Sequence, residues 1–230
     1  MLRLDAVTFQ NGSFRLAADL NVAKRRKVAV MGPSGSGKST LVNGVAGFHE
    51  AITGRLFWDG AEITAMAPGK RPVAMLFQDG NLFPHLSVRQ NAALGVRPDL
   101  KLSVGDWTRV DAALAEVGLG DLGARKPAEL SGGQQSRAAL ARVLSQARPI
   151  LILDEPFAAL GPALKHEMLD LVERLVEETG ATLLMVTHDP GDATRIADDI
   201  ILVEGGQAHP PSSATKMLAN PSPALRAYLG

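Results

Sequence analysis

A nine-residue segment constrains this chain more than any other feature. It fits the phosphate-binding pattern G-x-x-x-x-G-K-[ST]. The apolar run 27–31 precedes it and predicts a buried strand, and residues 40–43 predict the start of a helix. In that context the glycines let backbone N–H groups converge on a polyphosphate at a positive helix end, whereas a chance glycine-rich turn needs neither strand nor helix. We expect Lys38 to reach the terminal phosphates and Ser39 to bind Mg²⁺. The segment consists of Gly32, Pro33, Ser34, Gly35, Ser36, Gly37, Lys38, Ser39 and Thr40.

Composition excludes several other classes of protein. The 230 residues contain 24 Lys and Arg against 24 Asp and Glu, and this balance lacks the basic excess of a nucleic-acid-binding domain. There is no cysteine, so disulfides and thiolate metal sites are excluded. The N-terminus lacks the apolar core of a signal peptide, and no apolar run approaches the roughly 18 residues of a membrane span. Any membrane part is therefore expected to come from other subunits.

Strand-like and helix-like segments alternate along most of the chain. Apolar runs at 73–77, 150–153 and 182–186 predict strands buried on both faces of a parallel sheet. An apolar stripe at helical spacing follows Pro162 and predicts a helix. The alternation of such strands and helices predicts an α/β fold. The stretch 83–147 carries helix signals instead, such as the capping box of Ser87 with Gln90. We interpret about 1–82 and 148–210 as a catalytic core, 83–147 as an inserted helical subdomain and 211–230 as a C-terminal tail entered through a linker at 210–213.

Two carboxylates follow the predicted strand 150–153. Asp154 and Glu155 stand where a parallel sheet presents its ligand crevice. Asp154 is predicted to bind Mg²⁺, and Glu155 to activate a water that attacks the terminal phosphate. A solvated strand end is the alternative, which the phosphate-binding loop disfavours.

The segment Leu130-Ser131-Gly132-Gly133-Gln134 decides between the many phosphate-loop families. Ser131 and Gln134 form a capping box, and the two glycines between them clear space for an anion at a helix N-terminus. The segment matches the LSGGQ signature of the ATP-binding cassette (ABC) ATPases, and the resemblance extends over nearly the whole chain. It implies a RecA-like phosphate-loop core with a parallel sheet, an N-terminal antiparallel β part and an inserted helical subdomain.

The resemblance also assigns roles to further residues. Gln78 matches the glutamine that completes the Mg²⁺ shell, and His188 matches the histidine that orients the γ-phosphate and water. Two copies are expected to pack head to tail around two ATP molecules. Residues Ser131, Gly132, Gly133 and Gln134 of one copy would then bind the ATP held by Lys38 of the other.

Some positions depart from the family pattern. The loop after Glu155 usually resembles Ser-Ala-Leu-Asp, but Ala158 and Gly161 lack its hydroxyl and its carboxylate. We therefore expect slower or less cooperative hydrolysis, with binding intact. The aromatic residue that stacks on adenine is not evident, because Asn11 occupies its expected place; Phe9 and Phe14 are the candidates.

A cassette without fused membrane helices resembles the ATPase subunit of bacterial importers. Residues 71–78 and 81–86 resemble the ATPases of thiamine importers most, and importers of iron, spermidine, sulfate or molybdate remain alternatives. The expected partners are permease subunits, docked by residues 81–85, and indirectly a periplasmic solute-binding protein, but no nucleic acid. The chain would then lie peripherally on the cytoplasmic face of the inner membrane. A soluble ABC ATPase, a phosphate-loop kinase and a non-hydrolysing nucleotide-binding module are the rival interpretations.

Overall fold

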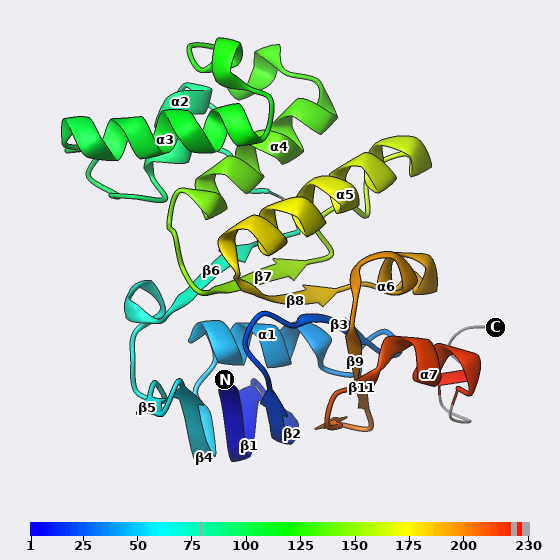
Figure 1. Ribbon diagram of the computed structural model, residues 1–230. Coiled ribbons are helices and arrows are strands. Elements are labelled where there is room, and N and C mark those ends of the chain that lie inside the picture. The colour runs from blue at the N-terminus through cyan, green and yellow to red at the C-terminus, as the bar shows by residue number, and fades with distance from the viewer. Residues whose placement is uncertain (79, 222–224, 227–230) are drawn as a thin grey trace.

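A single mixed sheet runs through the computed structural model, which describes residues 1–78, 80–221 and 225–226 (Figure 1). Its strands follow the order β5-β4-β1-β2-β10-β9-β3-β8-β7-β6, and β11 pairs with β9. The parallel part comprises β9 (Asp199–Glu204), β3 (Lys27–Met31), β8 (Thr182–Val186), β7 (Ile150–Asp154) and β6 (Val73–Leu76). The antiparallel part comprises β1 (Leu2–Asn11), β2 (Phe14–Val22), β4 (Ala51–Trp58) and β5 (Ala61–Glu62). The short strand β10 (Gln207–Ala208) joins the two parts.

The parallel strands are buried on both faces because successive side chains point into two different cores. In β7, for example, Ile150 and Ile152 pack with α1 (Lys38–Ala46) and the antiparallel strands. Leu151 and Leu153 pack on the other side, with α5 (Pro162–Thr179). This alternation explains why these strands are nearly continuous apolar runs in the sequence.

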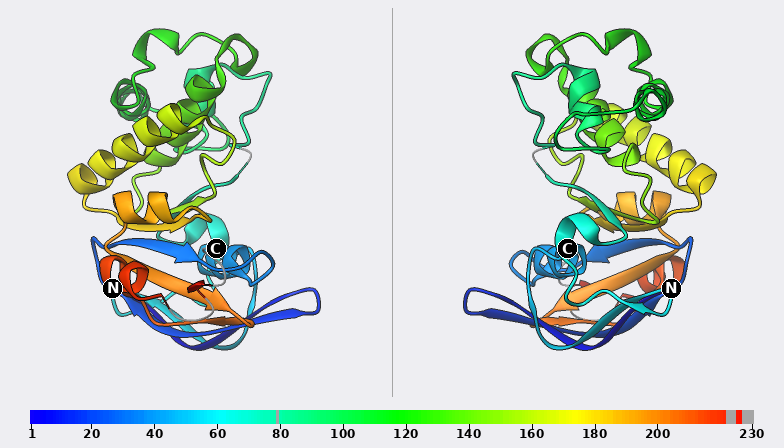
Figure 2. Two further views of the ribbon diagram at one scale, coloured as in Figure 1. Left: turned by 90° about the vertical axis from the view of Figure 1, so that its right-hand side faces the viewer. Right: turned by 90° about the vertical axis from the view of Figure 1, so that its left-hand side faces the viewer.

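Apart from α1, the α-helices gather in two places around the sheet. The helices α5, α6 (Pro190–Ile196) and α7 (Ala214–Ala219) lie on the face opposite α1 (Figure 1). The helices α2 (Val88–Ala93), α3 (Val104–Glu116) and α4 (Gly132–Leu144) form one end of the molecule, and the antiparallel strands form the other (Figure 2). Three short 3₁₀ helices are η1 (Pro68–Lys70), η2 (Gly120–Leu122) and η3 (Pro127–Glu129).

Most sequence predictions agree with these elements. The predicted strands and the helix after Pro162 are present. The described part of 83–147 contains helices and no strand. The capping box of Ser87 with Gln90 is also present. The division into core, subdomain and tail stays a prediction.

Two predictions need correction. Helix α1 begins at Lys38 rather than Thr40, because Gly37 in a left-handed conformation already serves as its N-cap. The predicted linker at 210–213 contains strand β11 (Ser212–Ser213), whose backbone pairs with Ile200 and Asp199 of β9. The later part of the tail, at 222–224 and 227–230, lies outside the described residues.

Candidate nucleotide-binding and catalytic site

The loop between β3 and α1 has a conformation that side chains would prevent. A Cβ at Gly32 would lie 2.0 Å from the carbonyl oxygen of Val203, in the neighbouring strand β9. A Cβ at Gly37 would lie 2.8 Å from the Phe14 ring, at a φ of +109°. The two glycines therefore hold the loop tightly against the sheet. Helix α1 begins directly after them, so its free N–H groups face the loop.

Two buried polar side chains, those of Lys38 and Ser36, lie within this loop. The Lys38 Nζ donates hydrogen bonds to the carbonyl oxygens of Gly32 and Pro33, each at 2.9 Å, and the residue is 9% exposed. Burial lowers the pKa of Lys38, while the nearby Glu155 and Asp154 oppose this. Among the described residues, the Ser36 hydroxyl is buried and has no hydrogen-bond partner. A polyphosphate oxygen would accept from the Ser36 hydroxyl and from the third N–H of the Lys38 ammonium group.

An open cavity of about 450 Å³ adjoins the loop. Besides residues of the loop itself, Asn11, Phe14 and Glu155 line it. Phe14 therefore remains a candidate for contacting a base. The suggestion of Phe9 is wrong, because its ring is completely buried in the core, where it packs on Gly44 of α1.

Two oxygen-bearing side chains, one from the start of α1 and one from the end of β7, lie close together. The Ser39 hydroxyl donates a hydrogen bond of 3.4 Å to Asp154 Oδ1 at the end of β7. This spacing is close to the roughly 3 Å between neighbouring ligands of an octahedral Mg²⁺ ion. Burial raises the pKa of Asp154, the hydrogen bond from Ser39 opposes the rise, and the charge of Glu155 adds to it. A bound cation would relieve this repulsion, so these groups fit Mg²⁺.

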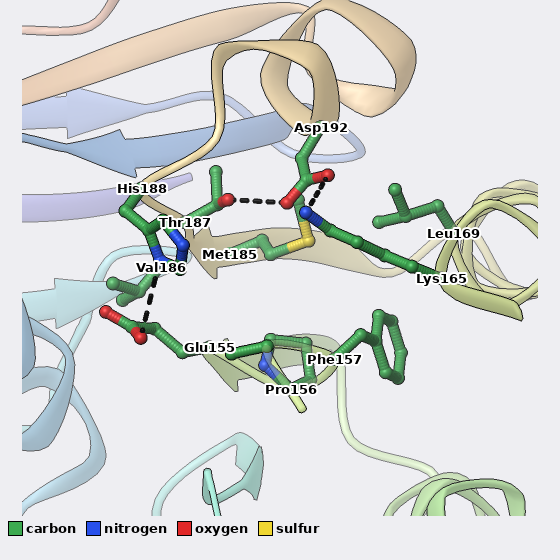
Figure 3. A pocket seen from close by; sticks show the side chains of 11 residues that line it. Glu155, Pro156, Phe157, Lys165, Leu169, Met185, Val186, Thr187, His188 and Asp192 are labelled. Atoms are coloured by element: carbon green, nitrogen blue, oxygen red, sulfur yellow. Dashed lines mark hydrogen bonds and ion pairs between the residues drawn. The ribbon is translucent and has the colours of Figure 1, made fainter. Parts of the chain in front are cut away.

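Glu155 and His188 face each other across the ends of β7 and β8 (Figure 3). His188 Nδ1 lies 3.6 Å from Glu155 Oε2. The backbone N–H of Glu155 donates to the carbonyl oxygen of Val186, which holds the two strand ends together. Glu155 has a φ of +46°, a conformation that is strained for a residue other than glycine and is often found at functional sites. The structure thus brings the two predicted catalytic residues together.

Other predicted site residues lie elsewhere in the chain. Gln78 is exposed in a turn after β6, and in the described residues no hydrogen bond joins it to Ser39 or Asp154. Ser131 forms the predicted capping box with Gln134 at the start of α4. Those two residues and Gly133 line a separate pocket that shares no residue with the cavity at the loop. Within one chain, the signature segment and the phosphate-binding loop therefore form two separate sites.

The sequence analysis missed a charged network behind His188. Lys165 of α5 forms ion pairs with Asp189 at 2.7 Å and with Asp192 of α6 at 2.8 Å. Asp189 belongs to the segment Val186-Thr187-His188-Asp189, but nothing in the sequence places it beside Lys165. Only the packing of α5 against α6 brings these groups together.

A comparison with protein-family models decides the family, since the model described as ABC transporter matches residues 17–158. The chain belongs to the ABC transporter family. A protein of Ruegeria sp. (strain TM1040), named thiamine import ATP-binding protein ThiQ, is 60% identical over the full length of both chains. A protein of Cereibacter sphaeroides with the same name is 56% identical, again over both full lengths. The resemblance to the family that the signature segment indicated is therefore confirmed.

Solved structures of ABC cassettes share the fold. A cassette in a dimeric, post-hydrolysis state bound to ADP and Pi superimposes with a TM-score of 0.79 at 30% identity, covering 93% of this chain and 99% of that one. A nucleotide-free cassette from an ABC transporter gives a TM-score of 0.86 at 24% identity, covering 100% and 99%. The predicted ABC ATPase fold is confirmed. None of the helices in the described residues is long and apolar enough to cross a membrane.

Proposed function

We propose that this protein is the ATP-hydrolysing subunit of a thiamine importer. The observation that carries the proposal is the 60% identity over both full lengths to a protein named thiamine import ATP-binding protein. The site supports it, because the phosphate-binding loop, Asp154, Glu155 and His188 all meet at one edge of the sheet. The alternative is that the protein powers an importer of another small solute, and the test must distinguish this from thiamine import.

The geometry suggests how each residue would act on ATP. The N–H groups of the loop and of α1, together with Lys38 and Ser36, would bind the phosphates. Ser39 and Asp154 would hold Mg²⁺, with Gln78 completing its shell after a local movement. When bound, Mg²⁺ neutralises charge that develops on the phosphates. Glu155 would accept a proton from the attacking water, and His188 would orient that water and the γ-phosphate.

A second copy of the chain would complete each ATP site. The signature residues Ser131, Gly132, Gly133 and Gln134 cap α4, away from the loop of their own chain. The dimeric state of the ADP-bound cassette supports a pair of subunits. We infer a head-to-tail arrangement, in which the N-terminus of α4 faces the γ-phosphate held by the partner. Loss of that phosphate on hydrolysis would weaken the dimer.

The segment 81–85 is the proposed docking site for a permease. Its Phe83 side chain is exposed, and the ring packs edge-on against His85 with centroids 6.0 Å apart. The completely buried Asn91 of α2 fixes the segment, because its Oδ1 accepts from Phe83 N at 2.8 Å and its Nδ2 donates to Phe83 O at 3.1 Å. An exposed aromatic residue on a rigid backbone suits docking of a helix. Through this contact the protein would lie peripherally on the cytoplasmic face of the inner membrane.

Uptake of labelled thiamine by cells tests the function. Cells that produce the parent protein are compared with cells that produce Lys38→Ala at equal protein level, while ATP hydrolysis is measured on the purified transporters. Loss of both activities supports the proposal. Unchanged thiamine uptake with abolished hydrolysis contradicts thiamine as the cargo and sends the search to other solutes. Hydrolysis that survives Lys38→Ala contradicts the assigned phosphate site.

A further inference from the structure

The backbone on both sides of His188 is held by one network of charged and polar groups. Figure 3 shows its contacts between Thr187, Asp192 and Lys165. On the N-terminal side, the Thr187 hydroxyl donates to Asp192 Oδ2 at 2.6 Å. On the C-terminal side, Asp189 N donates to the same Thr187 hydroxyl at 3.1 Å, and Asp189 Oδ1 accepts from Gly191 N at 2.8 Å. The loop that carries His188 is thus closed on itself, although the His188 side chain is 58% exposed.

One cation from another element connects the two carboxylates of this loop. The Lys165 Nζ donates to Asp189 Oδ2 at 2.7 Å and lies 2.8 Å from Asp192 Oδ1. The side chains of Lys165 and Asp192 are only 16% and 9% exposed. Burial alone would lower the pKa of Lys165, but its hydrogen bonds to Asp189 and Asp192 outweigh that and raise it. The ammonium group is therefore charged at neutral pH in this arrangement.

Lys165 is linked to Glu155 along the chain as well as through His188. It lies in the first turn of α5, the helix that follows the loop after Glu155. A closed ring of contacts then runs from Glu155 through that loop to Lys165, across to Asp189, and back through His188 to Glu155. This ring connects Lys165 to the pair of His188 Nδ1 and Glu155 Oε2, which lie 3.6 Å apart.

The enclosed space between these groups is too small for a ligand. Its volume is about 10 Å³, and Phe157, Leu169 and Met185 close its apolar side. This is at most the room that one water needs. The side chains of Lys165, Thr187 and Asp192 that border it therefore bind one another rather than a ligand inside it.

We propose that Lys165 is a positioning residue, which holds the loop 187–189 so that His188 faces Glu155. The proposal rests on the proposed function, because it acts through the role of His188 in ATP hydrolysis. Without the ammonium group, Asp189 and Asp192 would repel each other across a partly buried space, and the loop would no longer be tied to α5. Small displacements of catalytic groups have large effects on rate, so the cost falls on turnover rather than on nucleotide binding.

The test measures steady-state ATP hydrolysis in the assembled transporter. Lys165→Met removes the charge at similar length, and we expect kcat to fall about 10- to 100-fold with KM for ATP changed less than threefold. Lys165→Arg keeps the charge and should recover part of the rate. Arg195→Met is the matched control, because Arg195 also joins α6 to α5 through Asp170, at 2.7 Å, but on the exposed surface. It should leave kcat within twofold of the parent.

The same substitution in a second background separates positioning from a general structural effect. In a His188→Ala protein, adding Lys165→Met should change kcat less than twofold, because the residue through which it acts is already absent. An equal loss in both backgrounds overturns the proposal, as does a full rate in Lys165→Met while His188→Ala is slow. A full rate in His188→Ala contradicts the assigned role of His188 and the proposal with it. Should Lys165→Met fail to fold, Lys165→Gln is judged by the same comparisons.

Discussion

Arg71 is the buried group whose removal should destabilise the fold most clearly. It is 3% exposed, and no acidic side chain pairs with it in the described part of the chain. Instead its guanidinium donates to four backbone carbonyl oxygens. The acceptors are Gly44 at 2.7 Å, Val45 at 2.9 Å, Thr64 at 2.7 Å and Met66 at 2.9 Å. The first two belong to the last turn of α1, so Arg71 caps the helix whose N-terminus follows the phosphate-binding loop.

The expected cost follows from these four bonds. A hydrogen bond to a charged group contributes about 1.5–3 kcal/mol, and four such bonds would exceed 6 kcal/mol if they were additive. Water that enters the vacated space restores some of these hydrogen bonds. Burial also destabilises the charged guanidinium, as the lowered pKa of Arg71 indicates, so its removal relieves part of the cost. We therefore expect Arg71→Met to lower the free energy of unfolding by about 3–5 kcal/mol. At about 2–4 °C per kcal/mol for a domain of this size, the melting temperature should fall by about 6–20 °C.

Urea denaturation of the nucleotide-free protein, followed by circular dichroism, measures this cost. The matched control is Arg148→Met, because Arg148 also donates to a nearby carbonyl oxygen, that of Gly69 at 3.0 Å, but is exposed. It should change the free energy of unfolding by less than about 0.5 kcal/mol. Arg71→Lys keeps the charge but loses the planar fork, so it should lie between the parent and Arg71→Met. Equal effects of Arg71→Met and Arg148→Met would refute the reasoning.

Three further changes have defined outcomes. Glu155→Gln should lower kcat for ATP hydrolysis about 10²- to 10⁴-fold with nucleotide binding retained in a fluorescence titration, and an unchanged rate would contradict its role as base. Gly161→Asp adds a side chain where a Cβ meets nothing within 4 Å, at the N-cap of α5. It should stabilise the protein by about 0.3–1 kcal/mol in urea, and an unchanged rate and Hill coefficient in the transporter would contradict weakened coupling at this loop. Burial raises the pKa of Asp154 above its unfolded value, so its ionised form costs stability at neutral pH. Nucleotide-free Asp154→Asn should be more stable than the parent at pH 7. This advantage should shrink as the pH falls through the folded-state pKa and be lost below the unfolded-state pKa, where the carboxyl is protonated in both states. An advantage independent of pH would contradict the reasoning.

The parallel core was predictable because its signals are local. The strands β3, β6, β7 and β8 are buried on both faces, and each is therefore a short apolar run bounded by turn residues. The capping boxes of α2 and α4 were equally visible, since both partners lie within four residues. Strand β11 was not predictable, because Ser212 and Ser213 carry no strand signal of their own. They pair with Ile200 and Asp199 of β9, beyond the two residues of β9 with which the short strand β10 pairs.

The residues of the candidate site likewise divide into those that the sequence identifies and those that it does not. Groups that bind phosphate or Mg²⁺ are fixed by short segments whose spacing is constrained, so Lys38, Ser39 and Asp154 could be found without a structure. Phe9 and Phe14 could not be distinguished, because both are aromatic residues of neighbouring strands. The register of β1 and β2 places both on the same face of the sheet, so only their positions along α1 differ: Phe9 lies against Gly44, whereas Phe14 lies against Gly37 beside the cavity.

Arg71 and Lys165 were missed for a more general reason. The partners of Arg71 are backbone carbonyl oxygens, which every residue carries, so no pattern of residue types marks them. The partners of Lys165 lie 24 and 27 residues away on another helix. In each case a buried or half-buried cation fixes an element that carries a predicted site: for Arg71 the last turn of α1, whose first turn follows the phosphate-binding loop, and for Lys165 the loop of His188. The sequence motifs identify the groups that face the substrate, whereas the groups that hold them in place become visible only when distant elements are packed together.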